Sequence, residues 1–146
     1  MRIATVFYAL ALSANLLGAD PFLGIWTLNA AKSKFEPGAA PRSLTMTWTR
    51  DSDGIKVRSE GVRADGLPIN ETYIAVYDGK ERKKPGPWNF DAVINRSISD
   101  TEREDIFKKG GAIVGTSRLA VSADGKVLTT IWNYGELRDV RVFDKQ

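Results

Sequence analysis

Short stretches of alternating polar and apolar residues run along most of this chain. In the segment 43–50, Leu44, Met46 and Trp48 alternate with serine and threonine. A period of two places the apolar side chains on one face of a strand and the hydroxyl side chains on the other. The segment 55–62 repeats the pattern. Both segments therefore predict β-strands with one buried face.

Turn dipeptides separate these stretches. Asp53-Gly54, Asp65-Gly66 and Asp78-Gly79 follow one another at the spacing of one strand plus one turn. Asp-Gly pairs suit tight hairpins because glycine adopts positive φ without strain. We predict nine strands: Gly24–Leu28, Ser43–Arg50, Ile55–Val62, Ile69–Tyr77, Ala92–Ser99, Thr101–Lys109, Ala112–Ser122, Lys126–Tyr134 and Leu137–Asp144.

The predicted strands favour an all-β fold, an antiparallel up-and-down β-barrel of about eight or nine strands. Closure into a barrel removes exposed strand edges, and about eight strands enclose room for side chains or one small ligand. Charged residues make the segment 101–109 polar on both faces, so we expect an edge strand or a protruding hairpin there.

Two connections are long. In the segment 29–41, Asn29 is suited to cap a helical turn over Ala30–Lys34, and Phe35 is expected to pack on the sheet as a plug. The segment 78–89 is predicted to be a loop that contains Trp88.

Residues 1–19 have the layout of a secretory signal peptide. Arg2 precedes an apolar run, and small residues follow up to Ala19. The run is short for a membrane span. We therefore expect a mature domain over residues 20–146, secreted or periplasmic, with no stable membrane insertion after processing.

Composition excludes several classes of chemistry. The 146 residues contain no cysteine and no histidine, and the formal net charge is +3. Thiol nucleophiles, disulfides, Ser-His-Asp catalysis and the commonest metal ligands are therefore absent. The densest basic run, Lys80 to Lys84, has no interleaved aromatic residues for stacking on bases. We expect no enzyme activity, no cofactor, no metal site and no nucleic-acid partner.

The first predicted strand contains Gly24-Ile25-Trp26, and a Gly-x-Trp at this place resembles the lipocalin and calycin barrels. The N-terminal block around it and the later Gly110-Gly111 block are similar to small exported bacterial proteins described as lipocalin-like. The resemblance implies that Trp26 closes one end of the barrel, with an arginine packed across its ring. Candidates for that structural partner are Arg118, Arg138 and Arg141, of which Arg141 on the last strand is preferred.

Candidate ligand-binding residues are the aromatic side chains able to line or cover a cavity, together with one cation: Trp48, Tyr73, Tyr77, Trp88, Trp132 and Arg96. For the aromatic residues the alternative is ordinary core packing, and for Trp88 with Phe90 it is a hydrophobic latch on the rim. If Ile94 points inward, Arg96 points inward as well. Its guanidinium would then orient an acid group of a ligand. If Val93, Asn95 and Ser97 face inward instead, Arg96 is solvated.

Two functions follow. The first is a monomeric barrel that binds a small apolar or amphipathic molecule. The second is a filled barrel without a cavity, which acts through its surface as an envelope structural or interaction protein.

Overall fold

The structure, a computed structural model, describes residues 19–146. The predicted signal peptide lies outside these residues, apart from its last position. Within the described part, no helix is long and apolar enough to cross a membrane. The elements are β1 (Gly24–Leu28), the short 3-10 helix η1 (Ala30–Lys32), β2 (Ser43–Asp51), β3 (Gly54–Val62), β4 (Pro68–Ala75), β5 (Asp78–Lys83), β6 (Ala92–Ser97), β7 (Glu102–Lys109), β8 (Ala112–Val121), β9 (Val127–Tyr134) and β10 (Leu137–Lys145).

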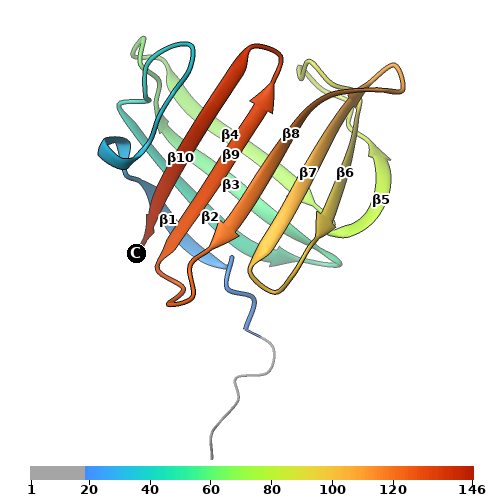
Figure 1. Ribbon diagram of the computed structural model, residues 1–146, viewed down its shortest axis with the longest axis horizontal. Coiled ribbons are helices and arrows are strands. Elements are labelled where there is room, and N and C mark those ends of the chain that lie inside the picture. The colour runs from blue at the N-terminus through green and yellow to red at the C-terminus, as the bar shows by residue number, and fades with distance from the viewer. Residues whose placement is uncertain (1–18) are drawn as a thin grey trace, which may run out of the picture.

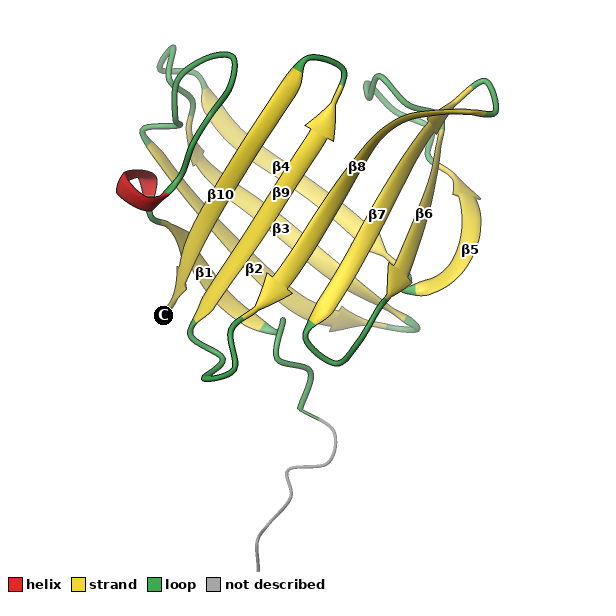
Figure 2. Cartoon of the chain, in the orientation of Figure 1, coloured by secondary structure: helices red, strands yellow, loops and turns green. Residues whose placement is uncertain are grey.

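All ten strands belong to one antiparallel sheet in the order β4-β3-β2-β1-β10-β9-β8-β7-β6-β5. Consecutive strands are neighbours, except β4 and β5 at its two ends, and β1 also pairs with β10. The sheet curls into a barrel in which β1–β4 form the far wall and β6–β10 the near wall (Figure 1). Figure 2 shows how little helix accompanies the strands. The predicted all-β up-and-down barrel is confirmed, with ten strands where nine were expected.

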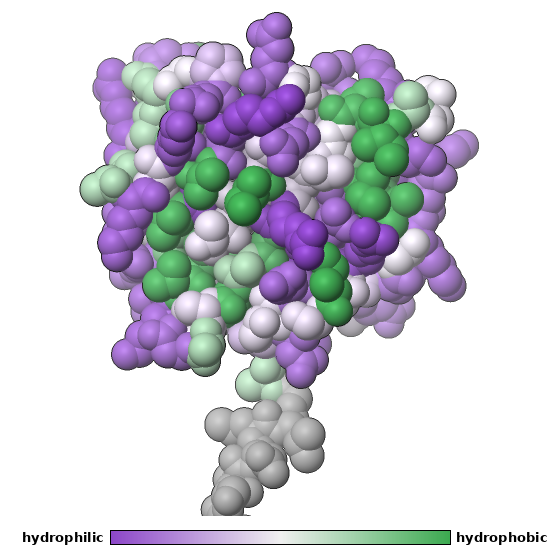
Figure 3. Space-filling view, in the orientation of Figure 1, coloured by the Kyte–Doolittle hydropathy of each residue, from purple (hydrophilic) through white to green (hydrophobic). Residues whose placement is uncertain are grey.

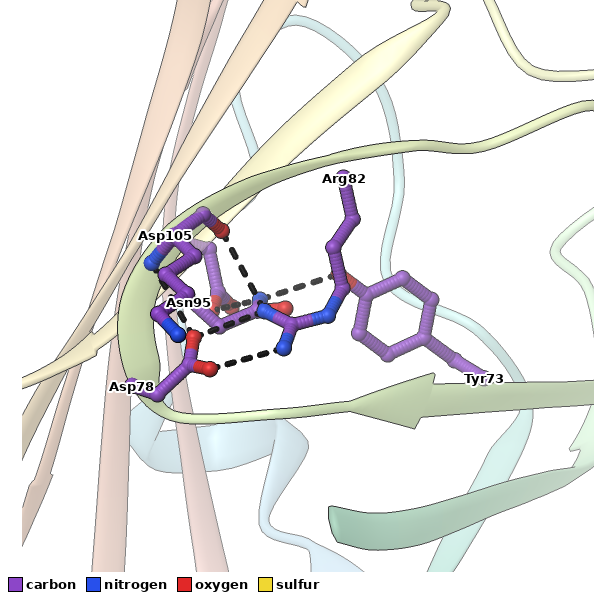
Figure 4. A network of polar contacts seen from close by, with 6 residues as sticks. Tyr73, Asp78, Arg82, Asn95 and Asp105 are labelled. Carbon is purple, nitrogen blue, oxygen red and sulfur yellow. Dashed lines mark hydrogen bonds and ion pairs between the residues drawn. The ribbon is translucent and has the colours of Figure 1, made fainter. Parts of the chain in front are cut away.

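The additional strand is β5, which was predicted to be part of a loop. Its sequence, Asp-Gly-Lys-Glu-Arg-Lys, has no apolar side chain and therefore no alternation. It is a strand because its backbone pairs with β6, across a bulge between Asp78 and Glu81. Arg82 bridges the bulge, donating two hydrogen bonds of 2.7 Å to the Asp78 carboxylate (Figure 4).

The two ends of the sheet, β4 and β5, leave a seam in the barrel wall that side chains cross. Lys84 donates a hydrogen bond from Nζ to the Ile74 carbonyl oxygen at 2.5 Å. The same ammonium lies 4.2 Å from the centroid of the Tyr73 ring. The barrel is thus held together at this seam by a cation and an aromatic ring.

The expectation of an edge strand at 101–109 is wrong. β7 lies between β6 and β8 in the sheet. Its inward side chains, Arg103, Asp105 and Phe107, are all buried. The inward charges are tolerated because partners meet them inside: Arg103 pairs with Asp20 at 2.5 Å, and Asp105 accepts a hydrogen bond from a neighbouring strand.

Trp26 belongs to the buried cluster that packs one end of the barrel. Its side chain is fully buried, and its indole Nε1 donates a hydrogen bond of 2.8 Å to the Phe22 carbonyl oxygen. The cation across its ring is Lys145, with Nζ 5.1 Å from the centroid, and not Arg141. Gly24 makes room for this contact, because a Cβ there would lie 2.9 Å from the Lys145 Cε.

The insert between β1 and β2 lies over the opposite end of the barrel. Asn29 caps η1 by accepting a hydrogen bond of 3.2 Å from the Lys32 backbone N–H, as predicted, although the helix is shorter than expected. Phe35, which follows, is half-buried beneath Arg141. The insert is tied to β10 by the Glu36 N–H, which donates to the Asp139 carboxylate at 3.0 Å.

Candidate functional site

The barrel contains a cavity of about 550 Å³. On one side it borders the buried cluster that fills the closed end of the barrel, including Trp48, Val57 and Phe143. On the other side it is bordered by the insert, residues 35–41, and by the β3–β4 turn. The cavity therefore lies between a packed base and two loops at the mouth.

Four of the six predicted ligand-binding residues line this cavity: Trp48, Tyr73, Tyr77 and Trp132. They come from β2, β4, the β4–β5 connection and β9. Trp48 is 3% exposed and packs on Phe22, with ring centroids 5.7 Å apart. Trp48 thus combines the two roles weighed for the aromatic residues, since it belongs to the core and also forms part of the cavity wall.

Arg96 does not line the cavity. It lies on the outer face of β6, where its guanidinium forms an ion pair with Glu104 of β7. The outer surface of the near wall is mostly hydrophilic, with separate apolar patches (Figure 3). The inward residues of β6 are Val93, which is fully buried, and Asn95, which is 2% exposed. Of the two orientations considered for Arg96, the outward one is observed. The prediction that Arg96 binds a ligand inside the barrel is therefore wrong.

Trp88 also lies outside the cavity lining. Its ring stacks on Phe90 at 5.9 Å, and Phe90 packs on Phe107 at 4.8 Å. Phe107 stacks in turn on Trp132, which lines the cavity. The latch alternative describes this arrangement, because the aromatic chain ties the β5–β6 loop to the barrel.

Arg141, the predicted partner of Trp26, lines the cavity instead. Its guanidinium lies 5.0 Å from the Trp132 ring centroid and 5.5 Å from that of Phe35. It donates a hydrogen bond of 2.7 Å to Asp139, whose side chain is 3% exposed. This ion pair connects β10 to the insert, because the same carboxylate also accepts the Glu36 N–H.

A second polar cluster crosses the seam (Figure 4). Asn95 of β6 donates from Nδ2 to the Asp105 Oδ1 at 2.6 Å and to the Tyr73 hydroxyl at 3.0 Å. Tyr73 and Asp105 both line the cavity. The amide of Asn95 thus fixes an acidic group and a phenol at one wall of the cavity.

Burial raises the pKa of the Asp105 carboxyl to about 7, although the hydrogen bond from Asn95 and the charge of Arg103 both act to lower it. Burial also raises the pKa of the Tyr73 and Tyr77 hydroxyls, and the charge of Asp105 adds to the effect. Both phenols therefore stay protonated at neutral pH, and a protonated phenol is able to donate a hydrogen bond.

The arrangement is suited to binding. Within residues 19–146, no group of three or more acidic side chains gathers in a way that could hold a metal ion. The cavity combines apolar walls with a few fixed polar groups, as small-molecule sites do.

Sequence reasoning missed Asp105 and Asp139 as cavity residues, and it missed Asn95 as the side chain that donates a hydrogen bond to Asp105. For Asp105 a signal existed, because Phe107 lies two positions along the same strand and so on the same face. Asn95 had been weighed only as the alternative to Arg96. For Asp139 nothing in the pattern marks a buried carboxylate, because its burial depends on the distant insert.

No protein-family model matches the sequence, and no similar sequence is found among curated proteins. Solved structures do resemble the chain. A Schistosoma mansoni fatty-acid-binding protein in complex with arachidonic acid matches with a TM-score of 0.58 and 15% identity, over 86% of this chain and 96% of that one. Fatty-acid-binding protein 1 of Echinococcus granulosus matches with a TM-score of 0.59 and 14% identity, over 86% and 97%.

A single-residue mutant of the fluorescent protein UnaG is similar to the same degree, with a TM-score of 0.60 and 15% identity, over 86% of this chain and 96% of that one. The fold is a calycin-like β-barrel. At these identities the likeness is one of fold, so any ligand must be argued from the cavity.

Proposed function

We propose that this chain is a small exported β-barrel protein, monomeric and without enzyme activity, that binds one small apolar or amphipathic molecule inside the barrel. The observation that carries the proposal is the cavity of about 550 Å³. Ligand pockets typically have volumes of about 300–1,000 Å³. The alternative, a filled barrel that acts through its surface, does not account for this space.

The lining supports an apolar occupant. Trp48, Met46, Leu119 and Phe143 present apolar surface to the cavity from three strands. Burial of apolar ligand surface against them contributes about 25 cal/mol per Å². Fatty-acid-binding proteins with the same fold, one of them solved with arachidonic acid, support the same class of ligand. Export is supported by the pattern of residues 1–19 in the sequence.

The experiment is a titration of the protein, residues 20–146, with Nile red, a neutral dye whose emission rises in apolar surroundings. We expect saturable binding of one dye per protein, displaced by an aliphatic competitor. A well-folded sample that binds no dye would favour the filled barrel and overturn the proposal.

A further inference from the structure

Among the described charged residues that line the cavity, the arginines all form ion pairs, whereas two of the acids do not. Both lining arginines form ion pairs: Arg141 with Asp139 at 2.7 Å, and Arg63 with Asp65 at 3.7 Å. The other two lining acids, Asp105 and Glu71, form no ion pair among residues 19–146. The charges of the cavity therefore do not balance, and the excess is negative.

Of these two acids without an ion pair in the described part of the chain, Asp105 is the buried one. Its side chain is on the inner face of β7, and the residue is 6% exposed. Oδ1 accepts the Asn95 amide, whereas Oδ2 accepts no hydrogen bond from any described residue. Because Asp105 lines the cavity, this oxygen is a free acceptor at the cavity wall.

The neighbouring cations are engaged elsewhere. Arg103, two residues before Asp105 on the same strand, pairs with Asp20 and lies between the Phe22 and Tyr77 rings, toward the closed end. Lys84 is held at the seam by the Ile74 carbonyl oxygen. Neither side chain lines the main cavity.

The remaining titratable groups around Asp105 carry no positive charge. Tyr73 and Tyr77 face it as phenols, and Glu104 lies next to it on β7 but pairs with Arg96 outside the barrel. Glu71 precedes Tyr73 by two residues on β4 and faces the cavity from the same side of that strand. Negative charge therefore borders the cavity from two strands.

We propose that the cavity selects an amphiphile whose polar end is a protonated amine, held by the free oxygen of Asp105, and not one that ends in a carboxylate. This inference rests on the proposed binding function. An ammonium group forms charge-assisted hydrogen bonds with a carboxylate. A ligand carboxylate at the same wall meets a like charge and finds both lining arginines already paired.

The amine is also expected to bind in a pH-dependent manner. Burial places the pKa of the Asp105 carboxyl at about 7, so its charge changes in the neutral range. An ammonium ligand is best bound by the ionised form. Amine and carboxylate ligands keep their own charges between about pH 6 and 8. Binding of the amine should therefore tighten as the pH rises over this range, and binding of the carboxylate should weaken.

The test is displacement of Nile red by dodecylamine and by dodecanoate, which share one chain length, at pH 8. We expect the amine to bind about tenfold more tightly than the acid, the effect of one additional hydrogen bond to a charged group. Asp105→Asn should remove most of this preference. Glu104→Gln is the matched control, because it removes the same charge from the adjacent, outward position of β7 and should leave the preference intact.

The outcomes separate the two proposals. If Nile red binds but dodecanoate binds as tightly as the amine, or Asp105→Asn keeps the preference, the inference is overturned while the binding function stands. If folded wild-type protein binds neither dye nor competitor, both fail. Should Asp105→Asn not fold, the wild-type series decides: a ratio of amine to acid affinity that rises from pH 6 to pH 8 supports the inference, and a constant ratio overturns it.

Discussion

Lys145 lies across the face of Trp26 at the closed end of the barrel, with Nζ 5.1 Å from the ring centroid. Lys145→Met keeps most of the aliphatic stem and removes the charge. We expect it to lower the free energy of unfolding by about 0.5–1 kcal/mol, the usual size of a cation–π contact. Urea denaturation measures this. Lys126→Met, at an exposed position, is the control and should change little.

Tyr73 of β4 contacts β6 across the seam, where its hydroxyl accepts a hydrogen bond of 3.0 Å from Asn95. Tyr73→Phe removes this bond and should cost about 1 kcal/mol of stability. Because β4 and β5 share no backbone pairing, the loss should appear locally as faster amide hydrogen exchange in these two strands. Unchanged exchange there would show that the hydroxyl does not hold the seam.

Arg141 is the only cation paired with Asp139 among the described residues, and Asp139 is 3% exposed. Arg141→Met leaves this carboxylate buried without its counter-charge. We expect a loss of about 2 kcal/mol, reduced from the value for a fully buried pair because the Arg141 side chain is partly exposed. The double variant Arg141→Met, Asp139→Asn should recover part of the loss. A double variant less stable than Arg141→Met would contradict the pairing.

Asp105 should make stability depend on pH. Its pKa is raised to about 7 in the folded protein, against the ordinary value of 3.8. The folded state therefore binds more protons than the unfolded state between these values, and the contribution of Asp105 to stability falls as the pH rises from about 4 to 7. Asp105→Asn should remove this component. Thermal melts of both proteins from pH 4 to pH 8 should show a difference that shifts in favour of the variant as pH rises, and a constant difference would refute the assignment.

The barrel could be predicted from the sequence because, in most strands, the residues that pair through their backbones also alternate between apolar and polar side chains. In β2 and β3 the apolar side chains follow a period of two, and their inward face is the one observed. β5 was missed because its inward and outward positions are both polar. β5 is a strand because it pairs with the free edge of β6, and the local pattern of polar and apolar residues does not reveal such a pairing.

The interior polar groups were harder to predict. On β6, Val93 and Asn95 share one face while Ile94 and Arg96 share the other, so both faces mix apolar and polar residues. Asn95 faces inward because Asp105 and Tyr73 meet it there, from other strands. For a similar reason the partner of Trp26 was misjudged, since strand register decides whether Arg141 or Lys145 reaches the ring.

The central claim, that the barrel interior receives a ligand, is tested most directly by filling it. Ser59→Phe places a ring in the cavity from β3, whereas Thr72→Phe places the same ring on the exposed outer face of β4. In Nile red titrations we predict that Ser59→Phe weakens binding at least about tenfold while remaining folded, and that Thr72→Phe binds like the wild type. Equal dye affinity in both folded variants would contradict an interior site.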